Sequence, residues 1–110
     1  MTNIVLIKEI ELTTNTGFDK DKEVNKLFDG PFRTLLEVRL QNGAVLSRHK
    51  AAEPITVFCL SGTGVFHAGS DLEDTQELRA GTLITLDGGV EHEVAATPAL
   101  HLIVTKFKDK

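Results

Sequence analysis

Two histidines occupy matching places in two stretches of the sequence. His49 comes six residues after Gly43 in the stretch that ends at Gly62, and His92 ends a stretch that begins at Gly81. Each stretch runs from a turn glycine through a short apolar segment to its histidine. A neutral imidazole binds divalent transition metals and carries protons near neutral pH. If the two segments are neighbours in the fold, the pair is the beginning of a metal site or the polar part of a pocket.

The two stretches resemble the two signature motifs of the cupin superfamily, small β-barrels that often hold one divalent metal. The family motifs have the forms G-x5-H-x-H-x3,4-E-x6-G and G-x5-P-x-G-x2-H-x3-N. The resemblance implies a small single-domain protein of the cupin 2 conserved-barrel family, with an incomplete metal-binding motif. Four family positions are altered: Ala51 replaces the second His, Ile55 the Glu, Asp87 the Pro and Ala96 the Asn.

The resemblance implies that His49 and His92 are the metal ligands, if a metal binds at all. The candidates for a third ligand are Glu53, His67 and His101. A cofactor would then be one divalent transition metal, namely Zn, Ni, Fe or Mn. No phosphate-binding glycine motif is present, so we expect no nucleotide cofactor.

The turn signals predict the strands on which these residues lie. They recur about every 8–12 residues, as in an all-β sandwich or barrel. We predict one domain over residues 1–110, with a barrel core over about 23–107 and tight turns at 41–43 and 61–64. With the resemblance, the fold class is all-β: the cupin double-stranded β-helix, a jelly-roll barrel of two antiparallel sheets. The predicted strands are 4–11, 23–28, 32–40, 44–49, 55–60, 64–68, 76–80, 83–86, 91–96 and 99–107.

The predicted core consists of apolar residues within these strands: Leu36, Val38, Ile55, Val57, Ile84 and Val94. Segment 55–60 is apolar on both of its faces, and such a strand needs cover on both sides. A partner subunit or the N-terminal strand would supply that cover, and many cupins dimerise through their sheets. We therefore expect a homodimer.

Composition excludes several classes of function. The 110 residues carry a formal net charge of −4 with scattered Lys and Arg, so we expect neither nucleic-acid nor membrane binding. No segment reaches the ~20 apolar residues of a membrane helix, and the N-terminus lacks the features of a secretory signal. A single cysteine cannot form an intramolecular disulfide. A cytoplasmic location is the default expectation.

Two main hypotheses for function remain. In the first, the barrel binds a small, largely apolar ligand in its central pocket, with the metal site absent or atypical. His49, His92, Ile55 and Val57 would line this pocket, and Arg39 and Arg48 would contact an anionic group near its mouth. The alternative is a metal-dependent enzyme of the dioxygenase, isomerase or decarboxylase type. A purely structural module is a third class, if side chains fill the cavity.

Overall fold

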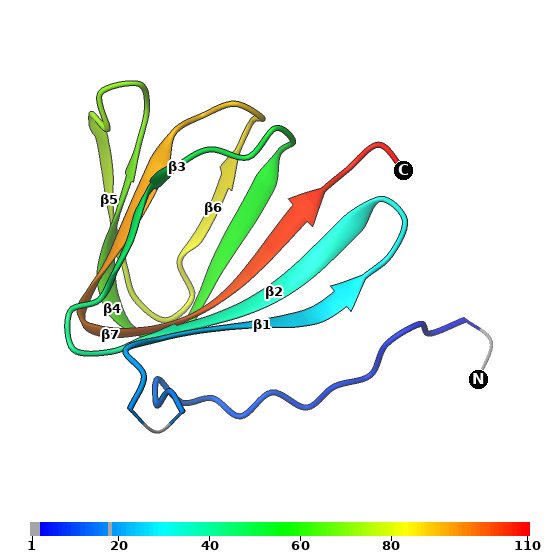
Figure 1. Ribbon diagram of the computed structural model, residues 1–110, viewed down its shortest axis with the longest axis horizontal. Coiled ribbons are helices and arrows are strands. Elements are labelled where there is room, and N and C mark those ends of the chain that lie inside the picture. The colour runs from blue at the N-terminus through cyan, green and yellow to red at the C-terminus, as the bar shows by residue number, and fades with distance from the viewer. Residues whose placement is uncertain (1–2, 18) are drawn as a thin grey trace.

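The computed structural model describes residues 3–17 and 19–110, and its regular structure consists of antiparallel strands, as the turn pattern predicts. The described residues contain no helix long and apolar enough to cross a membrane. Figure 1 shows the strands wrapped around a common interior. The strands are β1 (Lys22–Asp29), β2 (Arg33–Leu40), β3 (Val45–His49), β4 (Ile55–Ala68), β5 (Asp74–Leu78), β6 (Leu83–Leu86) and β7 (His92–Phe107).

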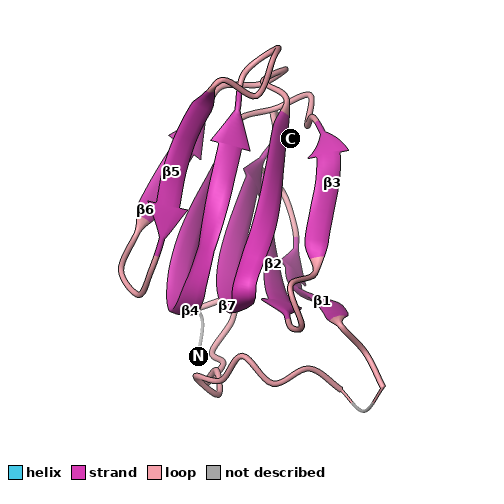
Figure 2. Ribbon diagram, turned by 90° about the vertical axis from the view of Figure 1, so that its left-hand side faces the viewer, coloured by secondary structure: helices cyan, strands magenta, loops and turns pink. Residues whose placement is uncertain are grey.

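Two long strands, β4 and β7, build both layers of the barrel. They pair with each other along their whole length, from Ile55 opposite Lys106 to Ala68 opposite His92. The layer here called sheet I contains β1, β2, the second half of β7, the first half of β4, and β6. Sheet II contains β3, the first half of β7, the second half of β4, and β5. Figure 2 shows sheet II in front of sheet I.

The continuity of β4 corrects one prediction. We expected a tight turn at 61–64 between two strands, but β4 runs through this segment without a break. The pairing register shifts between Cys59 and Ser61 and again between Gly62 and Gly64, which marks β-bulges. Bulges bend and twist a strand, so the glycines here redirect β4 from sheet I into sheet II instead of reversing the chain. β7 likewise joins the predicted strands 91–96 and 99–107.

The predicted hairpin turn at 41–43 is confirmed. Asn42 and Gly43 have φ values of 56° and 71°, as the two central residues of a type I′ turn require. This turn connects β2 of sheet I to β3 of sheet II and so brings the chain toward the first motif histidine.

The strand predicted at 4–11 is wrong, because this segment forms no ladder with either sheet. The composition from Ile4 to Ile7 suits a strand, but a strand forms only where a neighbouring edge accepts its hydrogen bonds. Instead, the Arg39 guanidinium donates hydrogen bonds to the carbonyl oxygens of Glu11 and Thr13. In Figure 1 the segment runs as an irregular chain below the strands.

The core lies between the two sheets. Four of the predicted core residues, Val38, Ile55, Val57 and Val94, are buried. Leu36 and Ile84 are only half-buried, because each faces a part of the interior that opens to solvent. The rest of the buried apolar set is Leu40, Cys59, Phe66, Ala68, Leu78, Ala96, Leu100 and Leu102.

Polar side chains are buried on the other face of sheet I. His101 is fully buried, and its Nε2 lies 2.8 Å from Oε2 of Glu37. Burial acts to raise the pKa of Glu37, but hydrogen bonds from His101 and Asn25 and the charge of Arg39 together hold this pKa below its usual value of 4.5. Glu37 is thus kept ionised by three donors. Ser61 is the cross-strand partner of His101, and both Ser61 Oγ and His101 Nδ1 are buried without a hydrogen-bond partner among the described residues.

Gly62 gives the first testable prediction. Its φ is +86°, and an added Cβ would lie 2.2 Å from the carbonyl oxygen of Ala99, whereas at Gly43 (φ +71°) a Cβ would meet no atom within 4 Å. Gly43→Ala should therefore cost only the left-handed backbone strain, about 1 kcal/mol. Gly62→Ala adds overpacking against the β7 backbone, for a total of about 2–4 kcal/mol. Chemical denaturation of both variants measures the difference, and equal losses would show that β4 and β7 do not approach so closely.

Candidate functional site

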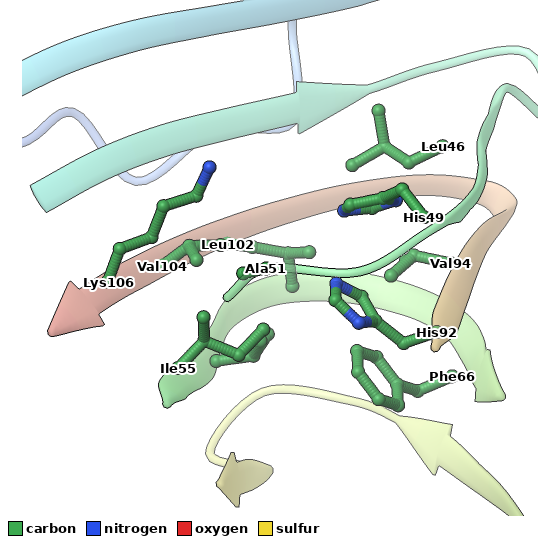
Figure 3. Close-up of a pocket in the computed structure, with 11 residues that line it drawn as sticks. Leu46, His49, Ala51, Ile55, Phe66, His92, Val94, Leu102, Val104 and Lys106 are labelled. Atoms are coloured by element: carbon green, nitrogen blue, oxygen red, sulfur yellow. The ribbon is translucent and has the colours of Figure 1, made fainter. Parts of the chain in front are cut away.

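The two motif histidines meet at one end of the barrel. His49 ends β3, His92 begins β7, and the two residues pair across the ladder of sheet II. Their ring centroids are 4.2 Å apart with an interplanar angle of 62°, and the ring of Phe66 stacks on His92 at 5.8 Å. Figure 3 shows both imidazoles directed into the same pocket. The motif spacing therefore predicts the proximity of the two histidines correctly.

Hydrogen bonds to the backbone set the tautomer of each ring. Nδ1 of His49 lies 2.7 Å from the carbonyl oxygen of Ser47, and Nδ1 of His92 lies 3.0 Å from that of Val90. A carbonyl oxygen only accepts, so each Nδ1 carries a hydrogen and each neutral ring has its lone pair on Nε2. Burial lowers the pKa of His92, and the neighbouring His49 and Lys106 lower it further, against a hydrogen bond to Val90 that raises it. His92 is consequently neutral at neutral pH.

The pocket around the histidines has hydrocarbon walls. Ile55 and Val57 face it from β4, as predicted. The enclosed part is small, about 40 Å³. The other apolar residues that line it are Leu46, Ala51, Phe66, Val94, Leu102 and Val104.

A wider groove continues from this pocket along the inner face of sheet I. Its volume is about 480 Å³, and Val24, Leu36 and Val38 form its apolar floor. Leu46, His49, Val104 and Lys106 line both spaces. The small cavity is thus the inner end of a larger open site.

Lys106 is a pocket residue that sequence reasoning missed. It lies on β7 directly opposite Ile55 of β4 and shares the pocket face with Val104 and Leu102. Alternation along the last strand contained this signal, since residues 102, 104 and 106 share one face. Figure 3 shows the Lys106 side chain across the pocket from His49.

Both arginines predicted at the mouth have other partners. Arg39 lies on the outer face of sheet I, where it contacts Glu37 at 3.0 Å and Glu23 at 3.7 Å. Its position on β2 has the opposite parity to Val38 and Leu40 of the core, so it does not reach the pocket. Arg48 borders the groove, but its Nε donates to Glu91 at 2.7 Å.

None of the three candidates for a third metal ligand lines the pocket. Glu53 is exposed in the loop before β4. His67 neighbours the pocket residue Phe66 on β4, so it faces the other way, where its Nδ1 lies 3.1 Å from Thr75 Oγ1. His101 is part of the buried cluster with Glu37 on the outer face of sheet I.

The donor set of the pocket does not fit a divalent cation. Two Nε2 atoms are available, but Ala51 and Ile55 place hydrocarbon where the family motif places a His and a Glu. The described residues include no cluster of three or more His, Cys, Asp or Glu side chains able to hold a metal ion. The ammonium of Lys106 adds a positive charge that opposes a cation. Catalytic metal sites normally have three protein ligands.

Restoring the family residues should create a metal site. Because Ile55 lies opposite Lys106, a glutamate at 55 would pair with that ammonium, so Lys106 is removed as well. We expect the variant Ala51→His/Ile55→Glu/Lys106→Met to bind Zn²⁺ or Ni²⁺ more than about 100-fold more tightly than the parent, by calorimetry, since a coordinating carboxylate contributes more than an outer-shell contact.

The matched control is Ala51→His/Ile55→Gln/Lys106→Met, which has the same size without the anionic ligand. Equal metal affinity of the folded variant and the parent would contradict the assignment of positions 51 and 55 to the pocket wall.

Comparisons with known proteins agree with this geometry. No protein-family model and no curated protein matches the sequence. Among solved structures, a cupin superfamily protein from Desulfitobacterium hafniense superimposes with a TM-score of 0.80 at 9% identity, over 94% of each chain. An RmlC-like cupin family protein with a double-stranded β-helix fold, from Methanocaldococcus jannaschii, has a TM-score of 0.72 at 14% identity, also over 94% of each chain.

A conserved protein of unknown function from Streptococcus pyogenes is also similar. Its TM-score is 0.78 at 21% identity, and the match covers 98% of this chain and 93% of that one. At these identities the likeness establishes the fold, and function has to be argued from the site.

Proposed function

From the cupin fold of this chain, we propose that it is a binding protein that holds a small, largely apolar ligand between its two sheets. One observation carries the proposal: Ala51 and Ile55, at two metal-ligand positions of the family motifs, contribute hydrocarbon to the pocket wall. A site with apolar residues at these metal-ligand positions gains binding free energy by burying the apolar surface of a small molecule. The two available Nε2 atoms add hydrogen-bond acceptors, which orient a ligand that carries a hydroxyl or amide donor.

The dimensions of the site support a ligand larger than the enclosed cavity. A volume of about 40 Å³ holds only a few water molecules, since each needs about 10–15 Å³. The adjoining groove of about 480 Å³ lies within the range of small-molecule sites, about 300–1,000 Å³. On this proposal the ligand lies along the groove and inserts one end beside His49 and His92.

A neutral fluorophore tests the proposal. N-phenyl-1-naphthylamine should bind one equivalent per chain with a rise in fluorescence. Ala51→Phe should fill the inner end of the pocket and weaken binding by at least about ten-fold, or 1.4 kcal/mol. Ala80→Phe, at an exposed site outside the pocket, is the matched control. Unchanged dye affinity in folded Ala51→Phe would place the dye elsewhere and remove the support for the pocket.

We also propose that the chain forms a homodimer through the outer face of sheet I. Phe58 of β4 pairs with Leu83 of β6 and with Ile103 of β7, so these side chains form one apolar patch on that face. Leu83 is 64% exposed and Phe58 37% exposed. A contiguous exposed apolar patch of this kind is typical of a protein interface.

Light scattering after size-exclusion chromatography tests the dimer. The parent should have twice the 12.0 kDa mass of the chain, and Leu83→Asp should have the mass of the monomer, because a charge on the patch opposes its burial. Val24→Asp, at another exposed apolar residue on the groove side of β1, should remain dimeric. A monomeric parent would contradict this proposal.

A further inference from the structure

We infer that the ligand of this site is an amphipathic anion, and that the Lys106 ammonium binds its carboxylate at the junction of pocket and groove. This inference rests on the proposed function and specifies the chemical class of the ligand. It starts from the position of Lys106, which lines both the enclosed cavity and the wider groove. A ligand that lies along the groove with one end in the cavity passes this side chain.

The charges around the site are of one sign. Lys22, Arg48 and Lys106 border the cavity or the groove, and among the described residues no Asp or Glu lines either space. The protein as a whole has a net charge of −4, so this local excess of positive charge runs against the overall composition. A cleft with positive walls attracts and retains anions.

Among the described residues, Lys22 and Lys106 are the cations of this group without a side-chain partner, and of the two only Lys106 also lines the enclosed cavity. Arg48 pairs with Glu91, and the nearby Lys108 pairs with Asp29 at 2.7 Å. Among the described residues, Lys106 forms no ion pair and no side-chain hydrogen bond. Its strand position places it on the pocket face beside Val104 and Ile55, and the residue is exposed, so its ammonium can reach an anion that enters from solvent.

His92 is a poor partner for a carboxylate, which favours Lys106 as the anchor. With Nδ1 donating to a backbone carbonyl, the Nε2 atom of neutral His92 is an acceptor and repels a carboxylate oxygen. The end of the ligand in the inner cavity is therefore apolar or carries a hydrogen-bond donor. The carboxylate lies beside Lys106 at the junction, and the apolar body of the ligand packs along the groove against Leu36, Leu46 and Val104.

Calorimetry with octanoate and 1-octanol, which share a chain and differ in charge, tests the inference at low ionic strength. The parent should bind octanoate at least about ten-fold more tightly than octanol, since a charge-assisted hydrogen bond is worth that factor or more. Lys106→Gln should remove this preference by weakening octanoate and leaving octanol unchanged. Lys106→Glu should reverse it, with octylammonium bound more tightly than octanoate. Lys110→Gln, an exposed lysine near the same chain end, is the matched control and should behave as the parent.

The outcomes separate this inference from the proposed function. Equal affinity of the parent for octanoate and octanol, or octanoate affinity unchanged by Lys106→Gln, would overturn the role of Lys106 while the binding pocket stands. Binding of N-phenyl-1-naphthylamine without binding of octanoate would likewise overturn only the anionic ligand class. Failure of all three probes to bind would overturn both.

Discussion

The pairing of β4 with β7 is the constraint on which the rest of the structure depends. Both strands belong to both sheets, so their shared bend decides how the layers face each other. Gly62 lies at this bend, and its missing side chain lets the two backbones approach near Ala99. Because β7 bends from sheet II into sheet I, its first residue, His92, and its late residue, Lys106, both line one pocket. The site is a consequence of the bend.

The two faces of sheet I differ in whether their charged side chains are paired. On the outer face, Glu37 is held ionised by His101, Asn25 and Arg39, so its buried charge is compensated by neighbouring side chains. Removing one partner from such a buried pair typically costs about 3–5 kcal/mol, because the other charge is left without compensation. On the inner face, Lys106 has no such partner among the described residues. An unpaired charge beside an apolar wall contributes little to folding, which is consistent with a role in binding.

The departures from the family motifs change the electrostatics of the pocket in a consistent direction. Ile55 removes the anionic ligand, Ala51 removes an imidazole, and Lys106 adds a positive charge beside them. A cation loses ligands and meets repulsion, whereas an anion meets a partner. On the proposed function, the pocket therefore has the opposite charge preference to the metal site that the family motifs describe.

Short-range features of the sequence determined much of the fold and part of the candidate site. Spacing and turn residues sufficed for the all-β class, the hairpin at Asn42 and Gly43, and the proximity of His49 to His92, because these depend on local backbone preferences and strand alternation. Local signals could not distinguish a turn at Gly62 from a bulge, since both need a positive φ, nor supply an edge for residues 4–11. Only the tertiary structure decided which face each strand turns to the interior. That decision placed Arg39 and His101 outside and Lys106 in the pocket, because register and burial arise from contacts between residues far apart in the chain.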